Sequence, residues 1–207
     1  MPRYLTDQDI ADFRAELCRV ATERFARLGY EGVTMRQLAE ALGCSPKTPY
    51  RYFKDKADIL ATVRAQAFGR FADALEAAAG EGGDPIDRAR RVGDAYLRFA
   101  AEHPHAYRIM FEIDQPLDDS HPDLAREAKR ARRHISRQAE EMAAAGLIAV
   151  DPVMFGWAMW AAVHGVVMLR QAGMLEDGPD YAALSRFQGG LMFKGAMTAT
   201  PKARKRR

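Results

Sequence analysis

Cysteine is scarce in this sequence, because Cys18 and Cys44 are its only two. Two thiols cannot build the multi-disulfide framework of a small secreted domain or a zinc site made of several cysteines. A secretory signal peptide is also not expected, since Asp7, Asp9 and Asp12 interrupt the start of the chain. The sequence therefore predicts a protein of the reducing cytoplasm.

Net charge is small as well. The 207 residues include 31 basic and 28 acidic side chains, which gives a formal charge of +3. Five of the basic residues lie within 202–207, so the remaining body carries a net charge of −2. A near-neutral body binds nucleic acid only through a local patch. The tail, 199–207, is expected to be disordered. Its charges would add an unspecific, salt-dependent attraction to phosphate, and the alternative is that they only keep the chain soluble.

Only one long hydrophobic run is present. Residues 152–169 carry no formal charge, which just reaches the roughly 18 residues that a membrane span needs. Gly156, Ala158, Ala161 and His164 dilute its apolar character. A helix that is apolar on every side also suits the centre of a bundle or an oligomer interface, and we predict such a buried helix.

Alternation with a period of two is absent over any useful length, whereas apolar residues recur at helical spacing from end to end. Gly29 stands where a left-handed residue would end the first helix, and Gly80–Asp84 is the clearest break. The pattern predicts an all-α fold of about nine helices. They are expected at 10–28, 34–42, from 45, 55–75, 84–99, 103–111, 122–145, from 151, and 179–197.

Residues 35–54 have the spacing of a helix-turn-helix unit. Ala39 supplies the small residue where two helices cross, and Gly43 supplies the turn. Thr34, with Gln37 three residues later, has the form of a capping box. On the second helix Lys47, Thr48, Tyr50 and Arg51 are expected to point outward, which suits insertion into a major groove. From spacing alone, an ordinary surface helix-turn-helix without a DNA role stays an alternative.

Residues 28–39, 42–45 and 50–56 closely resemble the DNA-binding domain of the TetR family of transcriptional regulators. The resemblance covers about residues 9–60. It implies a helix-turn-helix head (1–55), a helical effector-binding and dimerisation body (56–198), and a homodimer on double-stranded operator DNA. His103-Pro104 and His164-Gly165 resemble a Trp-His-Gly subclass, although Val163 stands where that subclass has tryptophan.

The residues expected to contact DNA follow from chemistry and from this resemblance. Arg51 is the main candidate for base recognition, since a guanidinium can grip guanine bidentately. Lys47 and Pro49 depart from the family pattern, and Pro49 predicts an irregular first turn because it lacks a backbone donor. The full predicted set is Thr34, Arg36, Ser45, Lys47, Thr48, Tyr50, Arg51, Tyr52 and Lys56. For Tyr52, packing in the core beside Phe53 is the alternative.

The central helices carry the residues that the resemblance places near an effector cavity. They are Phe68, Phe71, Tyr96, Phe99, Tyr107, Met110, Phe111, Met142, Trp160 and His164. For each one, plain core packing is the alternative. A mainly apolar lining with a few polar groups favours a small hydrophobic or aromatic effector. The last two helices, with Gly156, Gly165, Gly189, Gly190 and Gly195, form the predicted dimer interface.

No enzymatic, metal or cofactor motif is found. The sequence has no glycine-rich phosphate loop and no nucleophile elbow, and His164 has no second ligand at metal-site spacing. The basic run within 126–137 is interpreted as a solvated helix face. The predicted function is a homodimeric repressor that a small hydrophobic effector releases from a palindromic operator. The alternative is an effector-independent activator or architectural DNA-binding protein.

Overall fold

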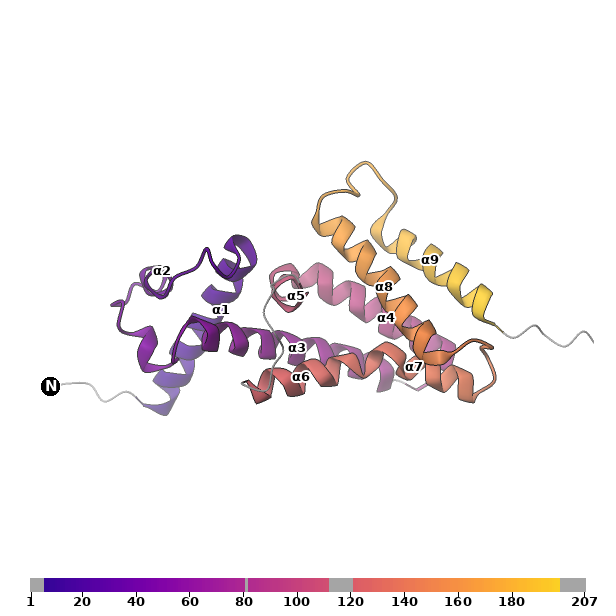
Figure 1. Cartoon of the computed structure of the whole chain (residues 1–207), viewed down its shortest axis with the longest axis horizontal. Coiled ribbons are helices and arrows are strands. Elements are labelled where there is room, and N and C mark those ends of the chain that lie inside the picture. Colours follow the sequence, from indigo (N-terminus) through magenta and orange to yellow (C-terminus); the bar gives the residue numbers. More distant parts are fainter. Residues whose placement is uncertain (1–5, 81, 112–120, 198–207) are drawn as a thin grey trace, which may run out of the picture. The chain divides into compact units, whose positions relative to one another are not determined.

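A computed structural model describes residues 6–80, 82–111 and 121–197 (Figure 1). This part of the chain is helical, and its only β element is an isolated bridge between Ile148 and Met197. The α-helices are α1 (Asp7–Leu28), α2 (Met35–Ala41), α3 (Lys56–Gly80), α4 (Pro85–Glu102), α5 (Pro104–Phe111), α6 (Pro122–Arg132), α7 (His134–Ala144), α8 (Pro152–Gln171) and α9 (Tyr181–Ala196). A short 3-10 helix, η1, spans Pro49–Arg51. The predicted all-α class is confirmed, while the basic tail lies outside the described residues.

Two predicted helices differ from the observed ones. The helix expected from Ser45 is reduced to turns and η1, because Pro49 has no backbone N–H and hydrogen bonds here join residues three apart. One of these bonds runs from the Arg51 amide to the Thr48 carbonyl, at 3.0 Å. The helix expected over 122–145 divides into α6 and α7 at Arg133, whose ψ of −26° is that of a 3-10 turn.

The described residues divide into two compact units. The first contains α1, α2, η1, α5, most of α6, and α3 as far as Asp73. Its core includes Leu17, Phe25, Leu38 and Ile59, each at most 1% exposed. Gly29 follows α1 with φ +71° and ψ 173°, so it has the expected positive φ but extended rather than left-handed helical geometry. The predicted functional boundary at residue 55 stays a prediction.

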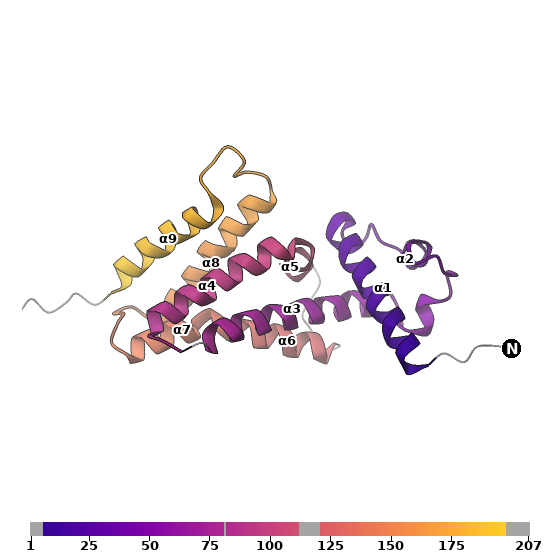
Figure 2. The same cartoon turned by 180° about the vertical axis from the view of Figure 1, so that it is seen from behind.

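The second unit contains the end of α3, α4 as far as Arg98, α7, α8 and α9. In both views α8 lies beside α7 and α9 (Figures 1 and 2). At the crossing of α7 and α8, a Cβ added to Gly156 would lie 2.3 Å from the Ile135 carbonyl oxygen. Gly156 therefore permits a close backbone approach. Phe155 and Met142 are buried in the adjoining core cluster.

Within the single chain, the apolar helix α8 is buried on one face only, so its predicted burial is met in part and the rest of its apolar surface stays exposed. Phe155, Gly156, Val166 and Val167 are buried, but Met154 is 70% exposed within the single chain. Among the described helices, α8 alone is long and apolar enough to cross a membrane. The neighbouring helices cover too little of its circumference to bury the remaining apolar side chains.

Candidate nucleic-acid interface

The helix-turn-helix geometry depends on local capping and on small buried residues. Thr34 caps α2, because its Oγ1 accepts a hydrogen bond from the Gln37 backbone amide at 3.2 Å, while Gln37 Oε1 accepts one from the Thr34 amide at 2.8 Å. The chain then turns at Gly43, where φ is +63°. Ala39 is fully buried, as a helix-crossing position requires. These features place η1 directly after α2.

An exposed polar edge runs along η1 and the turn before it. Lys47, Tyr50 and Arg51 are exposed, and Tyr50 keeps 56% of its surface accessible. The side chains of these three residues form no hydrogen bond or ion pair with any other described residue. Between them, Pro49 is buried and anchors the backbone. The arrangement presents a cation, a phenol and a guanidinium to an external partner.

Other predicted contact residues are already engaged within the chain. Ser45 Oγ and Thr48 Oγ1 lie 3.1 Å apart, which ties the turn together. Arg36 forms an exposed ion pair with Glu40, at 2.9 Å. Thr34 also uses its hydroxyl for the α2 cap. Ser45, Thr34 and Arg36 remain exposed at the surface, so each can still meet phosphate at its outer edge.

Tyr52 and Lys56 pack inside the head rather than pointing away from it. Tyr52 stacks on Phe13 of α1, with ring centroids 4.4 Å apart. Lys56 Nζ donates to the Tyr30 carbonyl at 2.8 Å and lies 3.9 Å from the centre of the Tyr30 ring. Partial burial raises the pKa of Tyr30, and the Asp55 and Glu31 carboxylates raise it further. Tyr52 and Lys56 therefore have a packing role, and a direct contact of either residue with phosphate stays a prediction.

Arg14 of α1 is a residue that the sequence did not single out. Its Nη1 donates a hydrogen bond to the Tyr52 carbonyl oxygen, and its guanidinium lies 4.2 Å from the centre of the Phe53 ring. The available signal was its position beside Phe13, three and four residues before the buried Leu17 and Cys18 on the same helix. Helical spacing thus predicts its inward direction but not its partners.

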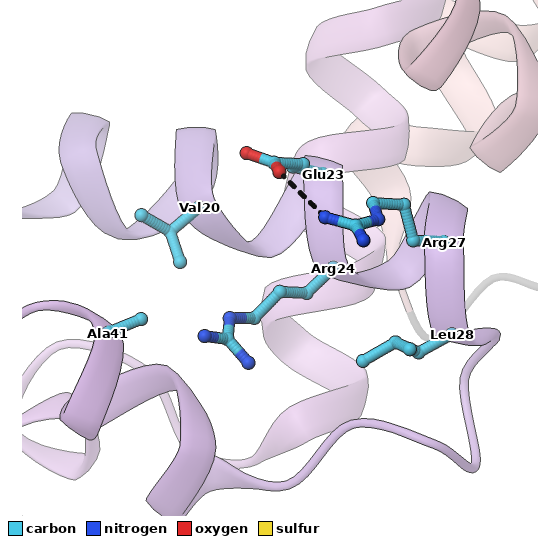
Figure 3. A pocket seen from close by; sticks show the side chains of 6 residues that line it. All are labelled: Val20, Glu23, Arg24, Arg27, Leu28 and Ala41. Atoms are coloured by element: carbon cyan, nitrogen blue, oxygen red, sulfur yellow. Dashed lines mark hydrogen bonds and ion pairs between the residues drawn. The ribbon is translucent and has the colours of Figure 1, made fainter.

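A small pocket lies between α1 and α2 in the same unit (Figure 3). The side chain of Arg24 extends between Val20 and Ala41, while Glu23 and Arg27 form an ion pair at 3.4 Å. Arg24 is half-buried and has no hydrogen bond or ion pair with another described residue. None of the predicted contact residues lines this pocket.

The predicted effector residues fall into separate groups. In the first unit, Phe111 packs against Phe68, Phe71 and Tyr107, with centroid distances of 5.8, 6.3 and 4.8 Å. Phe99 joins this group through Phe71. Met110 is buried on the same helix as Tyr107 and Phe111. This first group is therefore an aromatic cluster within the core of the first unit.

The second unit brings together Tyr96, Trp160 and His164. Tyr96 Oη and His164 Nδ1 lie 3.3 Å apart, and the Trp160 and His164 rings are stacked with centroids 5.4 Å apart. Met142 lies elsewhere in this unit, in the core with Phe155. The polar atoms of Tyr96 and His164 are thus paired with each other, and only Trp160 and His164 are partly exposed.

Chemistry other than binding has little support in the described residues. No group of three or more His, Cys, Asp or Glu side chains there could hold a metal ion. His103 packs its ring on Phe99, with centroids 4.9 Å apart. A larger hollow in the first unit is lined by polar and small residues of α3 and α6 and by Arg14 of α1, and its charged side chains form ion pairs such as Arg130–Asp73 at 2.6 Å. Its lining includes none of the predicted effector residues.

Comparison with known proteins agrees with this geometry. Residues 17–63 match the family described as bacterial regulatory proteins, tetR family, and residues 89–188 match the tetracyclin repressor-like C-terminal domain. Neither is a family of enzymes, which confirms the expectation that the chain is not one. The HTH-type transcriptional activator FasR of Mycolicibacterium smegmatis is 25% identical over 118 residues, which are 57% of this chain. The chain spans about half of that protein's length, at 52%.

Solved structures share the fold. A protein of unknown function from Rhodococcus sp. RHA1 superposes with a TM-score of 0.77 at 24% identity, over 96% of this chain and 100% of that one. The ketosteroid transcriptional regulator KstR2 of Mycobacterium tuberculosis gives a TM-score of 0.71 at 16% identity, over 90% and 96%. At these identities the likeness establishes the fold alone. The two family matches therefore assign an N-terminal helix-turn-helix domain of the tetR family of bacterial regulatory proteins to residues 17–63 and a tetracyclin repressor-like C-terminal domain to residues 89–188.

Proposed function

We propose that this protein is a DNA-binding transcriptional regulator that reads an operator through the exposed edge of η1. The observation that carries the proposal is the set of Lys47, Tyr50 and Arg51, which are exposed without a partner among the described residues, on a backbone anchored by buried Pro49 and Phe53. Arg51 is the base-reading residue, because a guanidinium bonds the two acceptors of guanine at once. Lys47 supplies a phosphate contact. A regulator of bacterial DNA acts in the cytoplasm.

The active species is a homodimer. One head reaches too few base pairs for tight specific binding, whereas two heads bind half-sites about 34–36 Å apart. A dimer is supported by exposed apolar side chains on α8 and α9. They are Met154, Trp157, Phe187 and Leu191, with exposed fractions of 70, 46, 64 and 56%. Apolar side chains gathered in this way on neighbouring helices suit a contact with a second copy.

A small hydrophobic effector controls DNA binding, by binding better to the conformation whose heads are mis-spaced for the operator. The aromatic group around Phe111 and the Tyr96–His164 pair are the candidate contacts, and the resemblance to the Trp-His-Gly subclass stays a prediction. The sign of regulation has two candidates. Release of a repressor is the first, and activation is the second because the relative FasR is described as an activator.

Selection of binding sites from a random DNA library, with the purified full chain, tests the proposal. We expect a palindromic motif for the native protein. Arg51→Ala should lose preference at one position in each half-site, and each lost base contact is worth about 1–3 kcal/mol. Arg27→Ala is the matched control, because this exposed arginine of α1 pairs with Glu23 and with no other described residue. Absence of duplex binding at low ionic strength would overturn the proposal.

A further inference from the structure

Arg14 and Phe13 connect α1 to the two residues that directly follow η1. Arg14 Nη1 donates to the Tyr52 carbonyl oxygen, and the same guanidinium lies 4.2 Å from the centre of the Phe53 ring. Phe13 stacks on the Tyr52 ring at 4.4 Å. Arg14 is itself half-buried. Nη1 and the planar face of the guanidinium are therefore turned toward the recognition segment, by which we mean η1 with Tyr52 and Phe53.

Few hydrogen bonds within the recognition segment fix its backbone conformation. η1 has three residues, and the amides of Arg51, Tyr52 and Phe53 bond only to the carbonyls of Thr48 and Pro49. So short a helix has weak internal bonding, and its last carbonyls have no partner within it. The carbonyl of Tyr52, the C-cap residue directly after η1, likewise has no partner within the helix, and Arg14 donates a hydrogen bond to it. The direction of Tyr50 and Arg51 consequently depends on contacts from α1.

We propose that Arg14 is a positioning residue for DNA binding, which fixes the end of η1 without touching DNA. This inference rests on the proposed function. Arginine suits the role because its guanidinium can bond a carbonyl with its edge while its face lies on an aromatic ring. Lysine, with a compact ammonium group, reproduces only part of this geometry.

The first test compares DNA affinities of full-length variants over a range of salt concentrations. Arg14→Met keeps the length of the apolar stem, and Arg19→Met is the control that removes the same charge from an exposed site on α1. We expect Arg14→Met to bind the selected operator about tenfold more weakly, as loss of a charge-assisted hydrogen bond implies. Random duplex should lose less affinity, and the salt dependence should match that of Arg19→Met. Arg14→Lys should lie between Arg14→Met and the native protein.

Two results would overturn this inference. Equal operator affinity of Arg14→Met and Arg19→Met would remove any positioning role. A salt slope lower by about 0.9 in Arg14→Met than in Arg19→Met would instead assign Arg14 to a direct phosphate contact. If Arg14→Met does not fold, the same comparison is made with Arg14→Lys against Arg19→Lys.

The second test needs no DNA, so it separates this inference from the proposed function. Amide hydrogen exchange of Arg51, Tyr52 and Phe53 should be faster in free Arg14→Met than in the native protein, and unchanged in Arg19→Met. Native exchange rates in Arg14→Met would overturn the positioning role even if the operator affinity falls. A native protein that ignores all duplex DNA would overturn the proposed function, and the exchange rates would still decide on Arg14.

Discussion

Three cationic side chains near η1 differ in the groups that surround their charge. Arg51 faces solvent, Arg14 lies over Phe53, and Lys56 lies over Tyr30 while bonding its carbonyl. A partly buried cation that donates to a carbonyl and lies on an aromatic ring keeps its charge, but it has fewer free N–H donors and less accessible surface for an external phosphate. At the residue scale, therefore, burial and not residue type separates the groups that we propose bind DNA from the groups that shape the surface.

Lys47→Ala should weaken binding to every duplex sequence alike. Lys47 is exposed and without a partner among the described residues, so its loss removes one phosphate contact and leaves the fold intact. The slope of log affinity against log salt should fall by about 0.9 per head. Titrations of operator and random duplex at several salt concentrations measure both effects. A changed base preference at constant slope would show a base contact instead.

Cys18 should make the folded state less stable at alkaline pH. Burial is the main reason that the pKa of its thiol is raised, so the unfolded chain loses this proton first as the pH rises. The folded state then binds more protons, and its stability falls above the ordinary thiol pKa of about 8.5. Urea unfolding at pH 8 and pH 10 should show a smaller decline for Cys18→Ala than for the native protein. An equal decline would contradict this effect.

At the scale of elements, the close approach of the α7 and α8 backbones determines which residue can stand at their crossing. Gly156 lies against the Ile135 carbonyl with no space for a side chain, whereas Gly93 of α4 has nothing within 4 Å of an added Cβ. Both are glycines inside helices, and both weaken the intrinsic preference for helix. Only the first is required by packing. In η1 the limiting factor is local instead of a packing contact. Pro49 keeps this element to three residues, and the contact from Arg14 of α1 holds its end.

Gly156→Ala should destabilise the second unit by about 1–3 kcal/mol, because the new methyl group forces α8 away from α7. Gly93→Ala is the control and should raise the free energy of unfolding by about 0.5–1 kcal/mol, since alanine is the better helix former. Chemical denaturation of both variants measures the difference. Equal free energies of unfolding for the two variants would mean that α7 and α8 accommodate the added methyl group without loss of stability.

At the scale of the whole molecule, the proposed function depends on a second copy. The exposed apolar face of α8 and α9 belongs to the part of the chain that is matched by the repressor-like C-terminal domain, apart from its last residues. A face of this kind is costly in water, and pairing would remove it from solvent. Pairing would also supply the second head that a palindromic operator requires.

Phe187→Asp should convert the dimer into monomers, because it places a charge in the apolar contact. Sedimentation of the variant should report one subunit where the native protein reports two, and operator affinity should fall at least tenfold. Gln66→Asp, at an exposed site on α3, is the control and should remain dimeric. A dimeric Phe187→Asp would place the interface elsewhere.

The sequence by itself determined the all-helical class, the capped helix at Thr34 and the turn at Gly43, because apolar spacing, capping and glycine conformation are local properties. It also marked Lys47, Tyr50 and Arg51 as outward residues. Only the tertiary structure decided that α1 reaches the Tyr52 carbonyl through Arg14, that Lys56 turns inward and that one face of α8 stays uncovered. These features depend on which distant side chains meet, and helical periodicity carries no information about such partners.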